Sequence, residues 1–240
     1  HKCIYITAID QNLHFAQWFK VIEKMGYDWY KDLVHVPFGL VSLESGKLST
    51  RKGNVVLMED LLSEAVKKTA AIIEEKNPNL PDKENVAKQV GIGAIIFNDL
   101  YNQRIKDVIF DWNKLLNFDG ETGPYVQYTY ARASSVLRKI GEVPDTIDYT
   151  LLTDEASIGL LKEIERYPQV IKDAAERYEP SVIARYSIDL AHAFNKFYHE
   201  CQINVEDETT KYTRTNVVKI ARYIIKDALS LLGIQCPEQM

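Results

Sequence analysis

The stretch Thr122-Gly123-Pro124-Tyr125-Val126-Gln127 divides the sequence into two parts with different patterns. Threonine is a good N-cap and proline is favoured in the first helical turn, so a helix is predicted over Pro124–Ile140 with Thr122 as its cap. Downstream, apolar residues recur at intervals of three and four, which is the spacing of one helix face. Further helices are predicted there over Glu155–Tyr167, Gln169–Arg177, Ser181–Cys201 and Arg214–Leu232. This part of the sequence therefore predicts a bundle of helices.

Upstream of that stretch, strand-like and helix-like segments alternate. Cys3–Ala8 is short, apolar and rich in β-branched residues, which is typical of a buried strand in a parallel sheet. Asn12–Met25 has apolar side chains at helical spacing, and Gly26 favours the end of that helix. Strand-like segments are also predicted within 33–41, 55–57 and 107–112, and helices over Glu59–Lys76 and Glu84–Gln103. The sequence thus predicts a mainly α fold with a partial α/β layer, followed by a helical bundle.

Composition restricts the class of protein and its partners. The 240 residues are 46% hydrophobic and 26% charged, which is ordinary for a soluble globular chain. No run approaches the roughly 18 apolar residues of a membrane span, so we expect a cytoplasmic location and no membrane partner. The net charge of −5 argues against a simple nucleic-acid binder, so we expect no DNA partner and RNA contact only through local patches. The three cysteines are far apart in the sequence, which predicts reduced thiols and no structural metal.

A basic loop lies between two apolar stretches and reads Gly46-Lys47-Leu48-Ser49-Thr50-Arg51-Lys52-Gly53-Asn54. Lysine and arginine supply charge-assisted donors to phosphate oxygens, and glycine allows close approach of the backbone. The loop therefore predicts a clamp for phosphate. The same pattern also fits a solvated loop that happens to be basic.

Several motifs together resemble those of the arginyl-tRNA synthetases, a family of class I aminoacyl-tRNA synthetases, over essentially the whole chain. Lys47-Leu48-Ser49-Thr50-Arg51 is similar to the family's KMSKS loop, and Lys52-Gly53-Asn54-Val55-Val56 is typical of its continuation. Gly123-Pro124-Tyr125-Val126-Gln127-Tyr128 resembles the start of the family's anticodon-binding helical domain. Asp189-Leu190-Ala191 and Pro237-Glu238-Gln239-Met240 resemble parts of the last helices of that domain and the segment after them.

The resemblance implies a domain organisation and a function. Residues 1–117 would be the C-terminal part of a Rossmann-like catalytic domain with connecting helices, and residues 118–240 would be the helical anticodon-binding domain. The implied enzyme is a monomeric ligase that uses ATP, together with Mg²⁺, to activate L-arginine and then transfers the arginine to its tRNA.

The five histidines include no HIGH-like pair, so we expect the chain to be a fragment that lacks the HIGH half and is inactive alone. One alternative is a non-catalytic paralogue that keeps the bundle to bind tRNA or another protein. Another is the cysteinyl enzyme, which resembles this bundle but needs zinc-ligand cysteines that the sequence does not show.

The resemblance also implies roles for residues of the catalytic part. Cations of the basic loop would stabilise the charge that develops on the departing pyrophosphate, with Lys47 as the main group. The residues expected to act there are Lys47, Ser49, Arg51 and Lys52. Gln11 would help to hold arginine, His14 would lie near ATP, and Phe38 and Gly39 belong to the segment that seats adenine. From the pattern alone, His14 equally fits a surface or packing residue.

In the helical part, the resemblance implies contacts with tRNA. Tyr198, Gln202 and Met240 would contact the anticodon loop, because aromatic rings stack on bases of single-stranded RNA. Arg132 would contact phosphates of the tRNA, with Arg138 and Lys139 on the same candidate face. Judged by pattern alone, Tyr198 fits an ordinary core position of a bundle better than a binding site.

Overall fold

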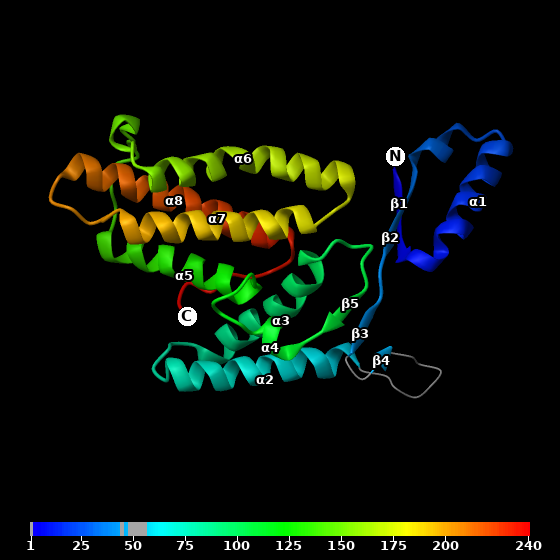
Figure 1. Cartoon of the computed structure of the whole chain (residues 1–240), viewed down its shortest axis with the longest axis horizontal. Helices are drawn as coiled ribbons and strands as arrows, with labels where there is room; N and C mark the ends of the chain where they lie inside the picture. The colour runs from blue at the N-terminus through cyan, green and yellow to red at the C-terminus, as the bar shows by residue number, and fades with distance from the viewer. Residues whose placement is uncertain (1, 44–45, 48–56) are drawn as a thin grey trace. The chain divides into compact units, whose positions relative to one another are not determined.

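The computed structural model describes residues 2–43, 46–47 and 57–240 (Figure 1). The chain divides into two compact units, one formed by His1–Val55 with Asn102–Asp111 and the other by Val56–Tyr101 with Trp112–Met240. Within the described ranges, no helix combines the length and the apolar character that crossing a membrane requires.

The first unit begins with a parallel strand pair joined through a helix. β1 (Cys3–Ala8) pairs with β2 (Leu33–Phe38), and α1 (Asn12–Lys24) lies between them in the sequence, flanked by the short 3-10 helices η1 (Ile9–Gln11) and η2 (Asp28–Asp32). The register places Ala8 beside Phe38, so the two strands end at the same edge. The predicted strand and the predicted helix are therefore both confirmed.

The burial predicted for β1 is wrong. Tyr5 faces α1, where its ring lies 5.2 Å from the ring centroid of Phe15 and 5.1 Å from that of Trp18. Successive side chains of a strand point to opposite faces. Ile4 and Ile6, on the face away from Tyr5, are 45% and 68% exposed, because in the described part of the chain only one face of the pair is covered by a helix.

A second small sheet completes this unit. β3 (Val41–Leu43) pairs in parallel with β5 (Val108–Phe110) and antiparallel with β4 (Gly46–Lys47), and β5 confirms the extended segment predicted within 107–112. The Gly39 N–H donates to the Arg104 carbonyl at 2.7 Å. A Cβ at Gly39 would clash with the Lys106 carbonyl, so glycine is what lets these two segments approach.

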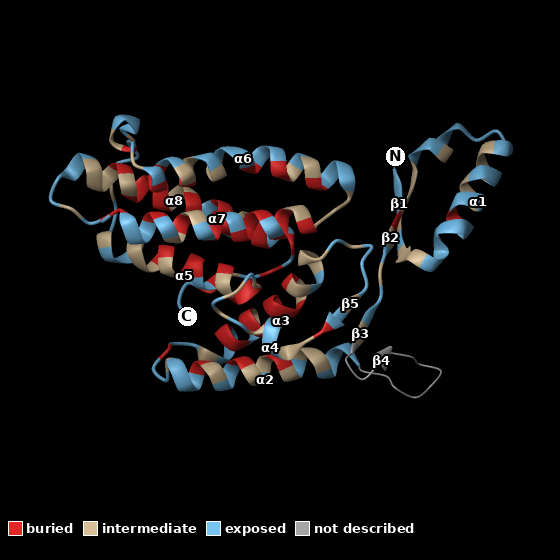
Figure 2. Ribbon diagram, viewed as in Figure 1, coloured by how far each residue is buried: buried red, intermediate tan, exposed pale blue. Residues whose placement is uncertain are grey.

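The second unit is helical. Its elements are α2 (Met58–Lys76), α3 (Lys83–Tyr101), α4 (Trp112–Leu115), α5 (Gly123–Ile140), η4 (Tyr149–Leu151), α6 (Glu155–Arg177), α7 (Ser181–Glu200) and α8 (Glu208–Leu231). The helices α2 and α3 pack on each other, and α5, α6, α7 and α8 pack together as a bundle (Figure 1). The buried positions follow the facing sides of these helices (Figure 2). The bundle core is apolar and includes Val126, Tyr130, Phe194, Phe197 and Leu229.

Side-chain caps and glycines set the helix ends. Thr122 caps α5 as predicted, because its Oγ1 accepts a hydrogen bond from the Tyr125 N–H at 3.3 Å. Asp154 caps α6 and Asp207 caps α8 in the same way. Gly141 has φ +81° and Gly233 has φ +76°, a region that glycine adopts without strain, so both act as the predicted stops.

The prediction of two helices separated at Pro168 is wrong, because α6 runs without a break from Glu155 to Arg177. Proline removes one backbone donor and disfavours a helix interior. Here Pro168 lies on the exposed side, while Tyr167 and Val170 on either side are buried in the bundle core. The Tyr167 hydroxyl also donates to the Asp227 carboxylate at 2.6 Å, which ties this turn to α8. Tertiary packing therefore outweighs the local effect of the proline.

Candidate functional site

A pocket of about 520 Å³ opens in the second unit where α5 and α7 meet the segment after α8. Tyr128 and Arg132 of α5, Tyr198 of α7 and the residues Gln239 and Met240 contribute to its lining. The connection between α2 and α3 supplies further polar groups from Asn77 and Asn79. The pocket thus gathers side chains from distant parts of the sequence.

Arg132 lies at the centre of a group of aromatic side chains. Its guanidinium is 4.9 Å from the ring centroid of Tyr128 and 5.3 Å from that of Tyr198. Arg132 also donates a hydrogen bond to Asn195 at 2.5 Å, and Asn195 in turn donates to the Tyr125 hydroxyl at 2.9 Å. A guanidinium above an aromatic ring is attracted by the ring quadrupole, so the cation and the two rings hold one another in place.

Tyr198 is a surface residue, although the bundle pattern alone favours a core position for it. Its side chain is 37% exposed, whereas the neighbouring Phe197 is fully buried. The ring of Tyr198 stacks on Phe194, with an interplanar angle of 20° and 6.4 Å between centroids. The packing on Phe194 restricts the ring, which is what a stacking platform for a planar ligand requires.

The charge of the pocket is opposite in sign to that of the whole chain. Arg132, Arg138 and Lys139 line it, and its lining residues include no aspartate or glutamate. The chain as a whole carries −5. A local cationic pocket with amide side chains is suited to an anionic ligand that also presents donors and acceptors, such as single-stranded RNA.

The structure brings together most of the residues predicted to contact tRNA. Arg132, Tyr198 and Met240 line the same pocket as Arg138 and Lys139. Gln202 is not among the lining residues. Its side chain donates to the Asn204 carbonyl at 3.3 Å, and its own carbonyl accepts from Arg214 at 2.6 Å.

Sequence reasoning missed Tyr128, Asn77 and Asn79 as parts of this pocket. Tyr128 and Arg132 are four residues apart on a predicted helix, a spacing that places side chains on one face, so this pair could have been found. The two asparagines come from a connection far upstream, and no local pattern relates them to α5.

The residues predicted to bind arginine and ATP lie at one edge of the first unit. Gln11 and His14 follow the end of β1, Phe38 is the last residue of β2, and Gly39 comes directly after it. Gln11 and His14 are exposed, as is Phe38 at 41%. The carboxyl ends of parallel strands are where open α/β sheets bind ligands, so the placement of these four residues fits their predicted role.

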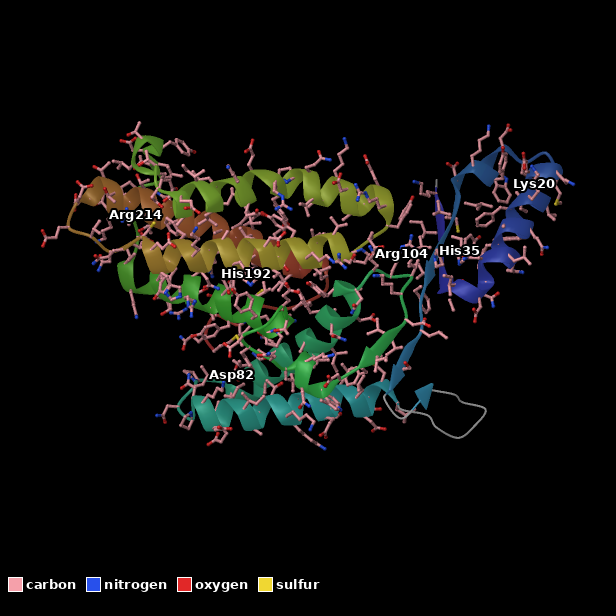
Figure 3. All side chains as sticks on the ribbon, in the orientation of Figure 1. Lys20, His35, Asp82, Arg104, His192 and Arg214 are labelled. Atoms are coloured by element: carbon pink, nitrogen blue, oxygen red, sulfur yellow. The ribbon has the colours of Figure 1, made fainter. Side chains whose placement is uncertain are left out.

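His35 and Arg104 support this edge from within (Figure 3). The His35 ring stacks on Phe15 with 4.3 Å between centroids, and its Nε2 shares a hydrogen bond of 2.8 Å with the Thr7 hydroxyl. Burial lowers the pKa of His35, and the nearby Arg104 cation lowers it further, so the imidazole stays neutral at pH 7. Arg104 donates to the Pro37 carbonyl at 2.6 Å, which fixes the end of β2 just before Phe38.

Most of the basic loop lies outside the described residues. Of its four predicted functional residues, Lys47 belongs to β4, whereas Ser49, Arg51 and Lys52 fall in the range that the structure does not describe. Elsewhere in the described ranges, no group of three or more histidine, cysteine, aspartate or glutamate side chains is arranged to hold a metal ion.

Comparison with known protein families matches two successive parts of the chain to two different domains. Residues 1–112 match the catalytic domain of class I (R) tRNA synthetases, and residues 126–240 match the DALR anticodon binding domain. The chain belongs to the arginyl-tRNA synthetase family. It therefore combines part of a class I synthetase catalytic domain with the helical anticodon-binding domain that follows it, which confirms the predicted fold class.

Individual synthetases match over the whole chain. An arginine–tRNA ligase of Alkaliphilus metalliredigens is 55% identical over 240 residues, and one of Clostridioides difficile is 52% identical. Each alignment covers 100% of this chain and 42% of the relative, so the chain spans less than half the length of these curated synthetases. The Thermus thermophilus arginyl-tRNA synthetase structure matches with a TM-score of 0.92 and 32% identity, over 100% of this chain and 41% of that one.

Proposed function

We propose that the whole protein is an arginine–tRNA ligase, which activates L-arginine with ATP and transfers the arginine to its tRNA. The observation that carries the proposal is the match of all 240 residues, at 55% identity, to a curated arginine–tRNA ligase. Within this proposal, residues 1–117 belong to the catalytic part and residues 118–240 form the anticodon-binding domain. The chain would act as a monomer in the cytoplasm.

The proposed role of the pocket is to bind unpaired bases of the anticodon loop. Tyr198 and Tyr128, which are 37% and 40% exposed, would supply aromatic surface for the bases, and Arg132 adds a cation in contact with both rings. Arg138 and Lys139 would neutralise phosphates of the same loop. Met240 supplies an apolar contact at the pocket wall, and Gln202, which lies outside the pocket, would contact a nucleotide beyond it.

For the activation step, we assign the basic loop to the phosphates of ATP. Attack of the arginine carboxylate on the α-phosphorus moves negative charge onto the departing pyrophosphate. Lys47, Arg51 and Lys52 would stabilise that charge more in the transition state than in the ground state, with Ser49 as a hydroxyl donor. This difference in stabilisation is what accelerates the step.

The edge of the parallel pair would hold the two small substrates. Gln11 would bind arginine, His14 would lie beside ATP, and the backbone at Phe38 and Gly39 would seat adenine. Magnesium would enter with the triphosphate. Since the described side chains form no metal-binding cluster, we assign none of them to the ion.

The test uses the full-length protein and two transcribed tRNAs, wild-type arginine tRNA and a version with a substituted anticodon. Binding is measured at two salt concentrations, and charging with arginine is measured in parallel. The proposal expects tighter binding of the wild-type tRNA and charging with arginine. Discrimination without charging would favour a non-catalytic paralogue that binds tRNA, and equal binding of both tRNAs would contradict the proposed role of the pocket.

A further inference from the structure

The segment 233–240 turns back from α8 and reaches the pocket. Gly233 makes the turn, and Ile234 is buried in the bundle core. The Gln235 carbonyl accepts a hydrogen bond of 2.7 Å from the fully buried Gln127 of α5. The segment ends with Gln239 and Met240 in the pocket lining. One wall of the pocket is therefore formed by a segment that has no regular secondary structure.

Glu238 fixes this segment immediately before the two lining residues. Its carboxylate accepts hydrogen bonds from Arg222 of α8 at 2.7 and 2.8 Å and from the Tyr130 hydroxyl of α5 at 2.5 Å. The Arg222 guanidinium lies 4.7 Å from the ring centroid of Tyr130, and its Nε donates to Ser134 at 2.7 Å. The Glu238 carbonyl accepts a further hydrogen bond from Arg138 at 2.9 Å. Glu238 thus ties the segment to both α5 and α8.

The protonation states suit this arrangement. Burial, together with the hydrogen bond to Glu238, raises the pKa of Tyr130 to about 12, so the hydroxyl remains a donor at neutral pH. Burial alone would raise the pKa of Glu238, but the hydrogen bonds from Tyr130 and Arg222 outweigh it and hold that pKa below its ordinary value. Glu238 is therefore charged and fully paired at neutral pH.

We propose that Arg222, Tyr130 and Glu238 form a clamp that positions Gln239 and Met240 in the RNA pocket and thereby sets the discrimination between anticodons. This inference rests on the proposed function. Neither Arg222 nor Glu238 lines the pocket, so both are positioning residues that act through the segment they hold.

Electrostatics alone predicts the opposite result for a change at Glu238. Removing a carboxylate near an RNA site reduces repulsion of phosphates and strengthens binding of any tRNA, matched or not. The clamp predicts instead that Glu238→Gln releases Gln239 and Met240 and weakens binding of the matched tRNA in particular. The sign of the change therefore separates the two explanations.

The experiment measures binding of wild-type and anticodon-substituted arginine tRNA to the full-length protein and to its Glu238→Gln variant. Hydrogen bonds to charged groups are worth enough that we expect the ratio of the two affinities to fall roughly tenfold. Glu155→Gln is the matched control, because it breaks the exposed ion pair of Glu155 with Lys196, 2.7 Å apart and away from the pocket lining. This control should leave the ratio unchanged.

A mutant cycle tests whether Glu238 acts through the two residues that it positions. With Gln239→Ala and Met240→Ala already present, Glu238→Gln should have little further effect on the ratio. Additive effects of the substitutions on the ratio would overturn the clamp. An affinity ratio that Glu238→Gln leaves unchanged, when the unmodified protein discriminates, would overturn it as well. If the unmodified protein does not discriminate, it is the proposed role of the pocket that fails. If a thermal melt shows that Glu238→Gln does not fold, Tyr130→Phe takes its place, because it removes only the hydroxyl. The ratio of its affinities for the two tRNAs then decides.

Discussion

Tyr198 presents a ring whose orientation is already restricted before any ligand binds. It stacks on Phe194 and lies beside Arg132, so little rotamer freedom remains to be lost. Stacking of a base on an aromatic side chain is worth about 1–3 kcal/mol. We expect Tyr198→Ala in the full-length protein to weaken binding of arginine tRNA by about 5- to 150-fold. Tyr198→Phe should retain most of the affinity, since the ring face is unchanged.

The control for this prediction is Tyr223→Ala, which removes an exposed tyrosine of α8 that is absent from the pocket lining. It should bind tRNA as the unmodified protein does. A loss of affinity as large as that of Tyr198→Ala would show that the effect belongs to general surface stacking and not to the pocket.

The prediction for the chemical step concerns Lys47. If its ammonium group stabilises charge that appears only in the transition state, Lys47→Ala should lower the rate of arginine activation by roughly 10²–10³. The KM for ATP should change much less, because ground-state binding is shared among several groups. Lys67→Ala, on the exposed side of α2, is the control and should have the normal rate. A change in KM alone would contradict the role assigned to Lys47.

Gly39 is a residue at which the backbone leaves no room for a side chain. An added Cβ would meet the Lys106 carbonyl, so Gly39→Ala should destabilise the first unit by about 1–3 kcal/mol. Gly159→Ala is the matched control, since no atom lies within 4 Å of its added Cβ and alanine is the better helix former in α6. Denaturant unfolding of the two variants should shift in opposite directions. Equal shifts would contradict the steric explanation.

At the scale of the element, the aspartate caps make helix stability depend on pH. Asp154 accepts hydrogen bonds from the Ser157 N–H at 2.8 Å and the Ser157 hydroxyl at 2.7 Å. Burial alone would raise the pKa of Asp154, but these hydrogen bonds outweigh it and hold the pKa below 3.8. Because the folded pKa is the lower one, the carboxylate contributes its full stabilisation only above the ordinary pKa of 3.8 that it has in the unfolded chain. The contribution is lost as the pH falls through the folded pKa.

Asp154→Asn tests this dependence, since asparagine caps a helix about as well as aspartate but does not titrate. Near pH 7 the variant should be slightly less stable than the unmodified protein, and the difference should disappear as the pH falls below 3.8. Denaturant unfolding at several pH values measures it. Glu165→Gln, an exposed change on the same helix, is the comparison. A pH-independent difference for Asp154→Asn would contradict the linkage.

The elements of this fold could largely be predicted from the sequence, because caps, stops and apolar spacing are local signals. Thr122, Gly141 and Gly233 all act as their types indicate. The error at Pro168 arose because burial of Tyr167 and Val170 is a tertiary effect that outweighs a local penalty. The burial of β1 also cannot be predicted from its local sequence, since burial depends on which neighbouring elements cover each face of the strand.

The candidate site was predicted less completely than the elements. Tyr198 and Arg132 were identified through family resemblance, whereas the pattern alone favoured the core for Tyr198. Their contact through one guanidinium depends on how α5 packs against α7, and the sequence does not contain that information in any local form. The same holds for Asn77 and Asn79, which reach the pocket from another helix pair.

At the scale of the whole molecule, the net charge of −5 means that a polyanion can be bound only through a local excess of positive charge. The pocket provides this excess through Arg132, Arg138 and Lys139 without an acidic lining residue. Each phosphate neutralised on a single strand contributes about −0.7 to the slope of log affinity against log salt. Lys139→Gln should therefore make the slope for arginine tRNA shallower by about 0.7 in the full-length protein.

Tyr198→Ala provides the internal comparison for the salt experiment. Stacking releases no counterions, so this variant should lose affinity at every salt concentration while its slope stays the same. Lys139→Gln should instead differ most from the unmodified protein at low salt and converge with it as the salt concentration rises. An unchanged slope in Lys139→Gln would mean that its ammonium group contacts no phosphate. Together the two slopes would separate the electrostatic part of binding from the part that the aromatic rings contribute.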